Sequence, residues 1–138
     1  MTWFAYALIS ALAAAGTAIL AKLGVEHIPS TLATAIRTVV VLIFAWAMVF
    51  ALREHQAIPN VSRRTLVFLT LSGIATGVSW LAYFRALQMA PASLVAPIDK
   101  LSLPLTIVLA AVFLREPLSW RLAAGVTLMV VGALIARG

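Results

Sequence analysis

Arg37, Asp99 and Lys100 are the residues of this sequence best placed to do chemistry, because each interrupts a long apolar stretch. A charge at the centre of a bilayer costs at least about 2.5 kcal/mol, so a charged residue inside a membrane span is a candidate functional site. One carboxylate and two cations can form an ion pair, exchange a proton or bind an anionic group. We therefore predict a substrate or proton site at these three residues.

The stretches around these charges are long enough to cross a membrane. The chain has 138 residues, of which 64% are apolar and only 10% are charged, whereas soluble domains are about half apolar and about a quarter charged. A span takes roughly 20 mostly apolar residues. We predict an all-α integral membrane protein with one transmembrane domain over residues 3–137. Its five transmembrane helices are expected near residues 3–22, 30–52, 65–86, 92–114 and 118–137.

The composition also argues against several other classes of protein. The absence of cysteine and the presence of only two histidines leave almost nothing from which to build a disulfide, a thiol nucleophile or a zinc site. The sequence has no phosphate-binding loop and no paired catalytic carboxylates, so we expect no enzyme activity, no metal and no cofactor. The net charge of +6 comes from single basic residues between apolar runs. This distribution is typical of topology signals and not of a nucleic-acid surface.

The basic residues near the helix ends give a weak signal of orientation. With the N-terminus in the cytoplasm, the inner side holds Arg53, Arg63, Arg64, Arg115 and Arg121, and the outer side holds Lys22, Arg85 and Arg137. Cytoplasmic loops carry the excess of Lys and Arg, so a cytoplasmic N-terminus in the cell (inner) membrane is favoured. Because the excess is small, insertion of copies in both orientations is compatible with it.

Arg37 and Asp99 are expected at the same depth. Each lies about seven residues into its helix, and both helices begin on the same side, so each charge lies roughly 10 Å below that surface. We predict that Arg37 and Asp99 meet as an ion pair, and that Lys100 points about 100° away from Asp99 around the helix. Two interpretations stay open. The charges either neutralise one another between packed helices while Lys100 reaches the headgroups, or they line the site.

Aromatic and proline residues surround these charges. Trp80 and Tyr83 should approach the depth of Arg37. Trp80 is a candidate wall of the pocket, and Tyr83 is either a further site residue or part of the interfacial aromatic belt, which we favour. Pro97 and Pro104 bracket Asp99 and Lys100, and an interior proline removes a backbone hydrogen bond. We therefore predict a break or kink in this helix.

Glycines mark candidate packing faces. Gly73 and Gly77 form a GxxxG pair in the third helix, and Gly125 and Gly132 share one face of the last helix. Small residues at this spacing allow helices to approach closely. We predict helix packing or a dimer contact at these four glycines.

Several short segments together resemble a known family between Leu8 and Ile135. They are Ala35–Thr38, Trp80–Leu87, Ala90–Ala96, Leu114–Ser119, and Gly125 with Gly132. Their order and spacing resemble the EamA domain of the drug/metabolite transporter superfamily. Most members of that family carry two five-helix repeats in inverted topology, so the resemblance implies one half of an inverted-repeat transporter, with the last helix as subunit contact. The sequence departs from the family where Asp99 and Lys100 stand in a helix that is usually apolar.

A single repeat can recreate the inverted geometry by pairing with an inverted copy of itself. Our leading hypothesis is a secondary transporter, an exporter of small metabolites or drugs, working by alternating access as an antiparallel dual-topology homodimer. Its expected partners are an anionic or zwitterionic small molecule and membrane lipid, and no nucleic acid. The alternative is a fixed-orientation membrane subunit or half-transporter that pairs with another membrane protein. A channel would need a continuous polar stripe, which none of the helices shows.

Overall fold

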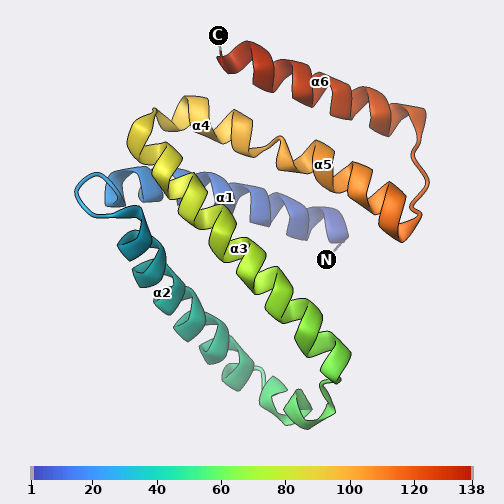
Figure 1. Ribbon diagram of the computed structural model, residues 1–138. Coiled ribbons are helices and arrows are strands. Elements are labelled where there is room, and N and C mark those ends of the chain that lie inside the picture. The colour runs from blue at the N-terminus through green and yellow to red at the C-terminus, as the bar shows by residue number, and fades with distance from the viewer. Residues whose placement is uncertain (1, 138) are drawn as a thin grey trace. The chain divides into compact units, whose positions relative to one another are not determined.

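The computed structural model describes residues 2–137, and helices make up nearly all of this part of the chain (Figure 1). In chain order they are α1 (Trp3–Gly24), α2 (Ser30–Ala51), the 3-10 helix η1 (Glu54–Asn60), α3 (Arg63–Met89), α4 (Ala92–Asp99), α5 (Ser102–Leu109), the π-helix η2 (Ala110–Leu114) and α6 (Trp120–Arg137). They form two compact units. Unit 2 comprises Leu20–Gln88, and unit 1 comprises the described residues up to Ile19 and from Met89 onward.

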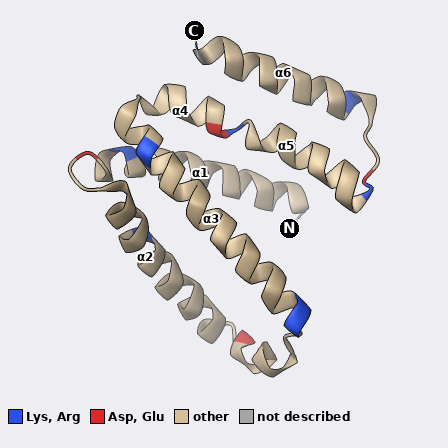
Figure 2. Cartoon of the chain, in the orientation of Figure 1, with Lys and Arg blue, Asp and Glu red and all other residues tan. Residues whose placement is uncertain are grey.

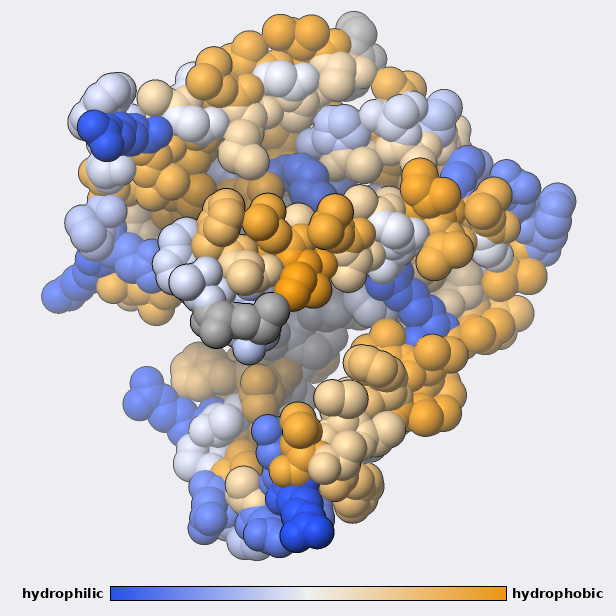
Figure 3. Space-filling view, turned by 180° about the vertical axis from the view of Figure 1, so that it is seen from behind, coloured by the Kyte–Doolittle hydropathy of each residue, from blue (hydrophilic) through white to orange (hydrophobic). Residues whose placement is uncertain are grey.

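The helices confirm the prediction of an all-α protein with several candidate membrane spans. Four segments are long and apolar enough to cross a bilayer, namely α1, α2, α3 and the segment Ala92–Leu114. The last helix is apolar but shorter, over Trp120–Ala136, so a fifth span stays a prediction. Most large apolar side chains are exposed, and they cover much of the face seen in Figure 3. A surface of this kind suits lipid as the solvent, because helices satisfy their backbone hydrogen bonds internally.

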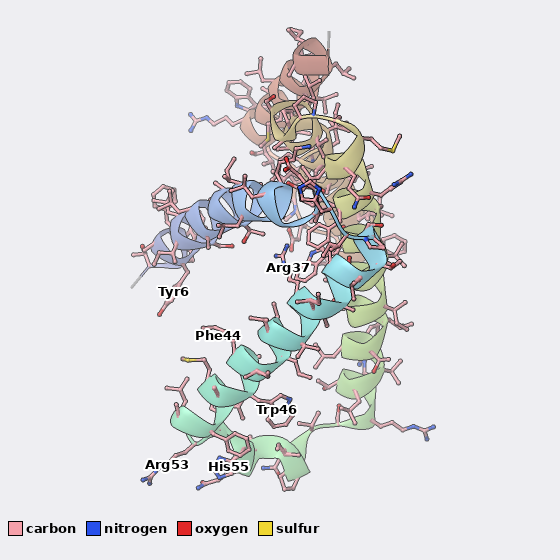
Figure 4. All side chains as sticks on the ribbon, turned by 90° about the vertical axis from the view of Figure 1, so that its left-hand side faces the viewer. Tyr6, Arg37, Phe44, Trp46, Arg53 and His55 are labelled. Carbon is pink, nitrogen blue, oxygen red and sulfur yellow. The ribbon has the colours of Figure 1, made fainter. Side chains whose placement is uncertain are left out.

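Unit 2 has its core at one end. The helices α2 and α3 approach each other where α2 begins and α3 ends, and they separate toward η1 (Figures 1 and 4). The buried apolar residues of this unit, Val25, Ala33, Phe84 and Leu87, all lie at this end. Thr34 is buried beside them, and its hydroxyl donates a 2.8 Å hydrogen bond to the Ser30 carbonyl oxygen. This end of the unit is therefore the best-packed part of residues 20–88.

Unit 1 is built around α6, which packs against both α4 and α5. Ala133 in α6 and Pro104 in α5 are buried. A small side chain and a compact ring at these positions let the helix axes approach closely.

The predicted helix near 92–114 is not continuous. The helix α4 ends at Asp99, and α5 begins at Ser102. Because Pro104 has no N–H, it cannot donate to the Lys100 carbonyl oxygen four residues earlier, and that oxygen accepts from the Leu103 N–H at 3.0 Å instead. The break therefore lies between Pro97 and Pro104, at Lys100 and Leu101.

The four predicted packing glycines are open in this chain. A Cβ atom added to Gly73 or Gly77 would have no neighbour within 4 Å in unit 2, and the same holds for Gly125 and Gly132 in unit 1. Neither pair brings a second helix of its own unit into close contact. A contact with another chain at these glycines stays a prediction.

Candidate functional site

Helix geometry brings Arg37 and two aromatic residues to similar depths in unit 2. Pro29 precedes α2 with an extended backbone, which suits the residue before a helix, and Arg37 lies about 10 Å along the axis from Ser30 at 1.5 Å per residue. The helix α3 runs back and ends at Met89. Counted from that end, Phe84 lies about 8 Å and Trp80 about 13 Å along the axis. The depth of Arg37 falls between the depths of these two rings.

The Arg37 guanidinium rests against both rings. Its Cζ atom lies 3.9 Å from the centroid of the Trp80 ring and 5.5 Å from that of the Phe84 ring. Both distances are within the roughly 6 Å over which a cation and an aromatic face attract each other. Phe84 is only 2% exposed, and Arg37 and Trp80 are half-buried. The rings therefore hold the guanidinium in a partly desolvated position, and Figure 4 shows Arg37 toward the end of α2 opposite to Arg53 and His55.

Tyr83 belongs to the same neighbourhood. It interacts electrostatically with the Arg37 guanidinium, and its ring centroid lies 6.4 Å from that of Phe84. The structure thus brings together Arg37, Trp80 and Tyr83, three of the residues that the sequence singled out.

The Arg37 guanidinium has N–H donors that another molecule can bind. A guanidinium carries five N–H donors in a planar fork, and stacking on a ring uses the face of this plane and not its edge. Within the described unit 2, Arg37 forms no ion pair and donates no hydrogen bond. Because an unpaired cation inside a span is costly, this edge is a candidate anion-binding position.

A cluster of polar side chains, Lys22, Arg85 and Gln88, closes the same end of unit 2. Lys22 Nζ donates to the Leu87 carbonyl oxygen at 2.6 Å. Gln88 Nε2 donates to the carbonyl oxygens of Val25 at 3.0 Å and Ile28 at 2.7 Å. Gln88 Oε1 in turn accepts from Arg85 Nη1 at 3.2 Å.

The Lys22 bond satisfies a carbonyl in the last turn of α3, which has no partner within its own helix, and the Gln88 bonds satisfy two carbonyls of the loop between α1 and α2. A lysine near a helix C-terminus is also favoured by the helix dipole. This helix-end cluster ties the end of α1 and the following loop to the end of α3. It therefore fixes the position of α3 against α2, and with it the position of the aromatic rings beside Arg37.

In unit 1, Asp99 pairs with Lys100. The Lys100 Nζ atom lies 3.2 Å from Asp99 Oδ2, at the break where Figure 2 shows an acidic and a basic segment side by side between α4 and α5. The helix α4 ends at Asp99, and Lys100 is the residue that caps it; the expected separation of about 100° around the helix stays a prediction. Arg37 belongs to unit 2 and Asp99 to unit 1, and an ion pair between them stays a prediction.

The sequence interpretation missed Phe84, Gln88 and the role of Lys22. A signal for the first two is present, since Trp80, Phe84 and Gln88 are spaced four residues apart and therefore share one face of α3. Lys22 and Arg85 were interpreted only as topology signals, although both lie in the last turn or turns of an apolar helix, where free carbonyls need donors.

The architecture and the half-buried Arg37 define a class, a multi-pass membrane protein with a cation held inside a span. Residues 1–138 match the EamA-like transporter family, and the chain therefore belongs to this family. The resemblance found in the sequence is confirmed.

A relative in Sinorhizobium sp, described as an uncharacterized transporter in the cobO 3′ region, is 47% identical over 134 residues, which are 97% of this chain and 95% of the relative. No solved structure matches the chain. The family and the relative point to a membrane transporter and not to an enzyme. A transporter family also implies a small-molecule substrate in a lipid environment.

Proposed function

We propose that the protein is a secondary transporter that exports small metabolites or drugs by alternating access, as an antiparallel homodimer in the inner membrane. The observation that carries this proposal is the Arg37 guanidinium, held on the Trp80 and Phe84 rings inside an apolar span. Desolvating a cation in this way costs free energy, and binding of a substrate at its free edge offsets that cost.

Each predicted site residue has a role in this proposal. Arg37, Trp80 and Tyr83 bind the substrate. Asp99 and Lys100 lie at the break between α4 and α5, where Asp99 exchanges the coupling proton and Lys100 stabilises its carboxylate form. Backbone carbonyls that are freed by breaks of this kind line cavities in many transporters.

Three observations support the homodimer. The 134 aligned residues are 95% of the relative, so the relative is about 140 residues long, too short for two five-helix repeats of roughly 20 residues per span. Gly73, Gly77, Gly125 and Gly132 are open within their own units and are available to a second copy. The basic residues divide five to three between the two sides, which permits insertion in both orientations.

Proton coupling is tested in proteoliposomes with an internal pH-sensitive dye. A library of small metabolites is added under an imposed pH gradient, and compounds that move protons only in the presence of the protein are retained. Asp99→Asn should abolish this proton movement while the helical content and the elution volume stay unchanged. Glu116→Gln, an acidic residue outside the spans, is the matched control and should behave as the natural chain. Unchanged proton movement in Asp99→Asn would reject the coupling role.

The homodimer is tested by topology reporters fused to the C-terminus. Signals from both sides of the membrane are the expected result, because antiparallel pairing needs both orientations. A signal from a single side would reject the homodimer. It would favour the second candidate, a fixed-orientation half-transporter that pairs with another membrane protein, and the partner would then be sought by crosslinking.

A further inference from the structure

The orientation of the Arg37 side chain limits the ligands that it can bind. The Arg37 Cζ atom lies over the Trp80 ring, 3.9 Å from its centroid, and 5.5 Å from the centroid of the Phe84 ring. The N–H groups point outward in the plane of the guanidinium, where two of them lie parallel and match the two oxygens of a carboxylate. A lysine at this position would present a single point charge without this fork.

The charges around Arg37 exclude other ligand classes. A cationic drug would need an aromatic face or a carboxylate, yet Arg37 already covers a face of Trp80, and it would repel a second cation. A phosphate monoester carries nearly two charges and three acceptor oxygens, whereas one guanidinium offsets one charge and pairs with two oxygens. The other cations at this end of unit 2 are already engaged, Lys22 with the Leu87 carbonyl and Arg85 with Gln88.

The Asp99 carboxylate has its own cation. Lys100 Nζ lies 3.2 Å from Asp99 Oδ2, so these two charges offset each other inside unit 1. Within the described part of unit 2, no carboxylate forms an ion pair with Arg37. A zwitterionic ligand would also need an anionic position for its cationic group, and unit 2 supplies none in an ion pair beside Arg37.

We infer that Arg37, stacked on Trp80 and Phe84, is a bidentate receptor for the single carboxylate of a small organic anion, and that such monocarboxylates are the substrate class. This inference rests on the proposed transport function, but it concerns binding alone. Binding is measured without a gradient, so a failure of transport and a failure of carboxylate recognition give different results.

The test uses the purified full chain in nanodiscs with Trp80 as its only tryptophan, Trp3, Trp46 and Trp120 being replaced by Phe. Three probes of similar size are titrated while Trp80 emission is recorded: benzoate, neutral benzamide and cationic benzylammonium. We expect benzoate to change the emission saturably, with a midpoint at least about tenfold lower than that of benzamide, because a charge-assisted bidentate pair is worth about that factor. Benzylammonium should leave the emission unchanged.

Variants locate the effect at the guanidinium fork. Arg37→Lys keeps the charge and should raise the benzoate midpoint about tenfold, whereas Arg37→Gln should abolish the response. Arg53→Gln, an exposed arginine beyond the end of α2, is the matched control and should leave the midpoint unchanged.

Three outcomes would overturn the inference. They are equal midpoints for benzoate and benzamide, a preference for benzylammonium, and an unchanged benzoate midpoint in Arg37→Lys. The comparison of the three probes on the natural Arg37 chain needs no substitution at the site, so it decides the question even where a variant fails to fold. Carboxylate binding without proton-linked transport would instead reject the proposed function alone.

Discussion

The contact between Arg37 and Trp80 has a free energy that a double-mutant cycle can isolate. The perturbations are Arg37→Leu, Trp80→Leu and the two together. The Cζ atom lies 3.9 Å from the ring centroid, and both side chains are half-buried. Because cation–π contacts are worth about 0.5–1 kcal/mol at exposed sites and about 2 kcal/mol when desolvated, we expect a coupling free energy of about 1–1.5 kcal/mol.

The single variants alone do not give the coupling free energy between Arg37 and Trp80. Removing the charge of Arg37 from a span also removes a cost of at least about 2.5 kcal/mol, and this gain is larger than the contact that is lost. Arg37→Leu can therefore stabilise the chain although it breaks a favourable contact. The cycle cancels this difference, because the same charge is removed with and without the Trp80 ring.

The assay is reversible unfolding by sodium dodecyl sulfate in mixed micelles, followed by far-ultraviolet circular dichroism. A second cycle of Arg37→Leu with Trp46→Leu is the control, because Trp46 lies nine residues further along α2 and pairs with Phe50. Its coupling should be near zero, since sites this far apart act independently. A coupling below about 0.5 kcal/mol in the Trp80 cycle, or an equal value in both cycles, would refute the assignment of the aromatic rings as the support of Arg37.

Two further predictions concern the supports of the candidate site. Gln88→Leu removes two hydrogen bonds to the Val25 and Ile28 carbonyl oxygens and should lower the free energy of unfolding by about 2 kcal/mol, at about 1 kcal/mol for each bond. The matched change Gln56→Leu, at an exposed glutamine, should cost less than about 0.5 kcal/mol; equal losses in the same detergent assay would contradict the role of the helix-end cluster. Pro104→Ala restores an N–H opposite the Lys100 carbonyl, so hydrogen exchange should become slower at the break between α4 and α5, and unchanged exchange would mean that another feature causes the break.

The depth of each site residue along its helix was largely predictable from the sequence. Because a helix rises 1.5 Å per residue, counting from residue 30 and back from residue 86, the predicted helix ends, brings Trp80 and Tyr83 toward the depth of Arg37. The observed end at Met89 places Arg37 between Trp80 and Phe84. The rotation of α3 about its own axis was harder to derive. Trp80 and Tyr83 were both candidates, whereas Phe84 is the second ring within about 6 Å of the cation, because the bonds of Gln88 at the end of α3 orient that face.

The ends of the helices were predicted less well than their positions. The helix α3 extends from Arg63 to Met89, beyond the expected residues 65–86. A bilayer limits the apolar part of a span, but a helix continues through polar residues as long as its backbone hydrogen bonds have partners. At the end of α3, Lys22 is such a partner, because its Nζ atom donates to the Leu87 carbonyl oxygen. Gln88 in turn donates to the Ile28 carbonyl oxygen in the neighbouring loop.

The sequence by itself determined that the chain is helical and crosses a membrane, because apolar length and scarce charge leave no other way to satisfy the backbone in lipid. It also determined which charges lie inside the spans, since these follow from position alone. The tertiary structure decided their partners. Asp99 pairs with Lys100 at the break between α4 and α5, and Arg37 rests on Trp80 and Phe84 because contacts far apart in the chain hold α3 against α2. Such contacts depend on side-chain orientation in three dimensions, which helical periodicity does not contain.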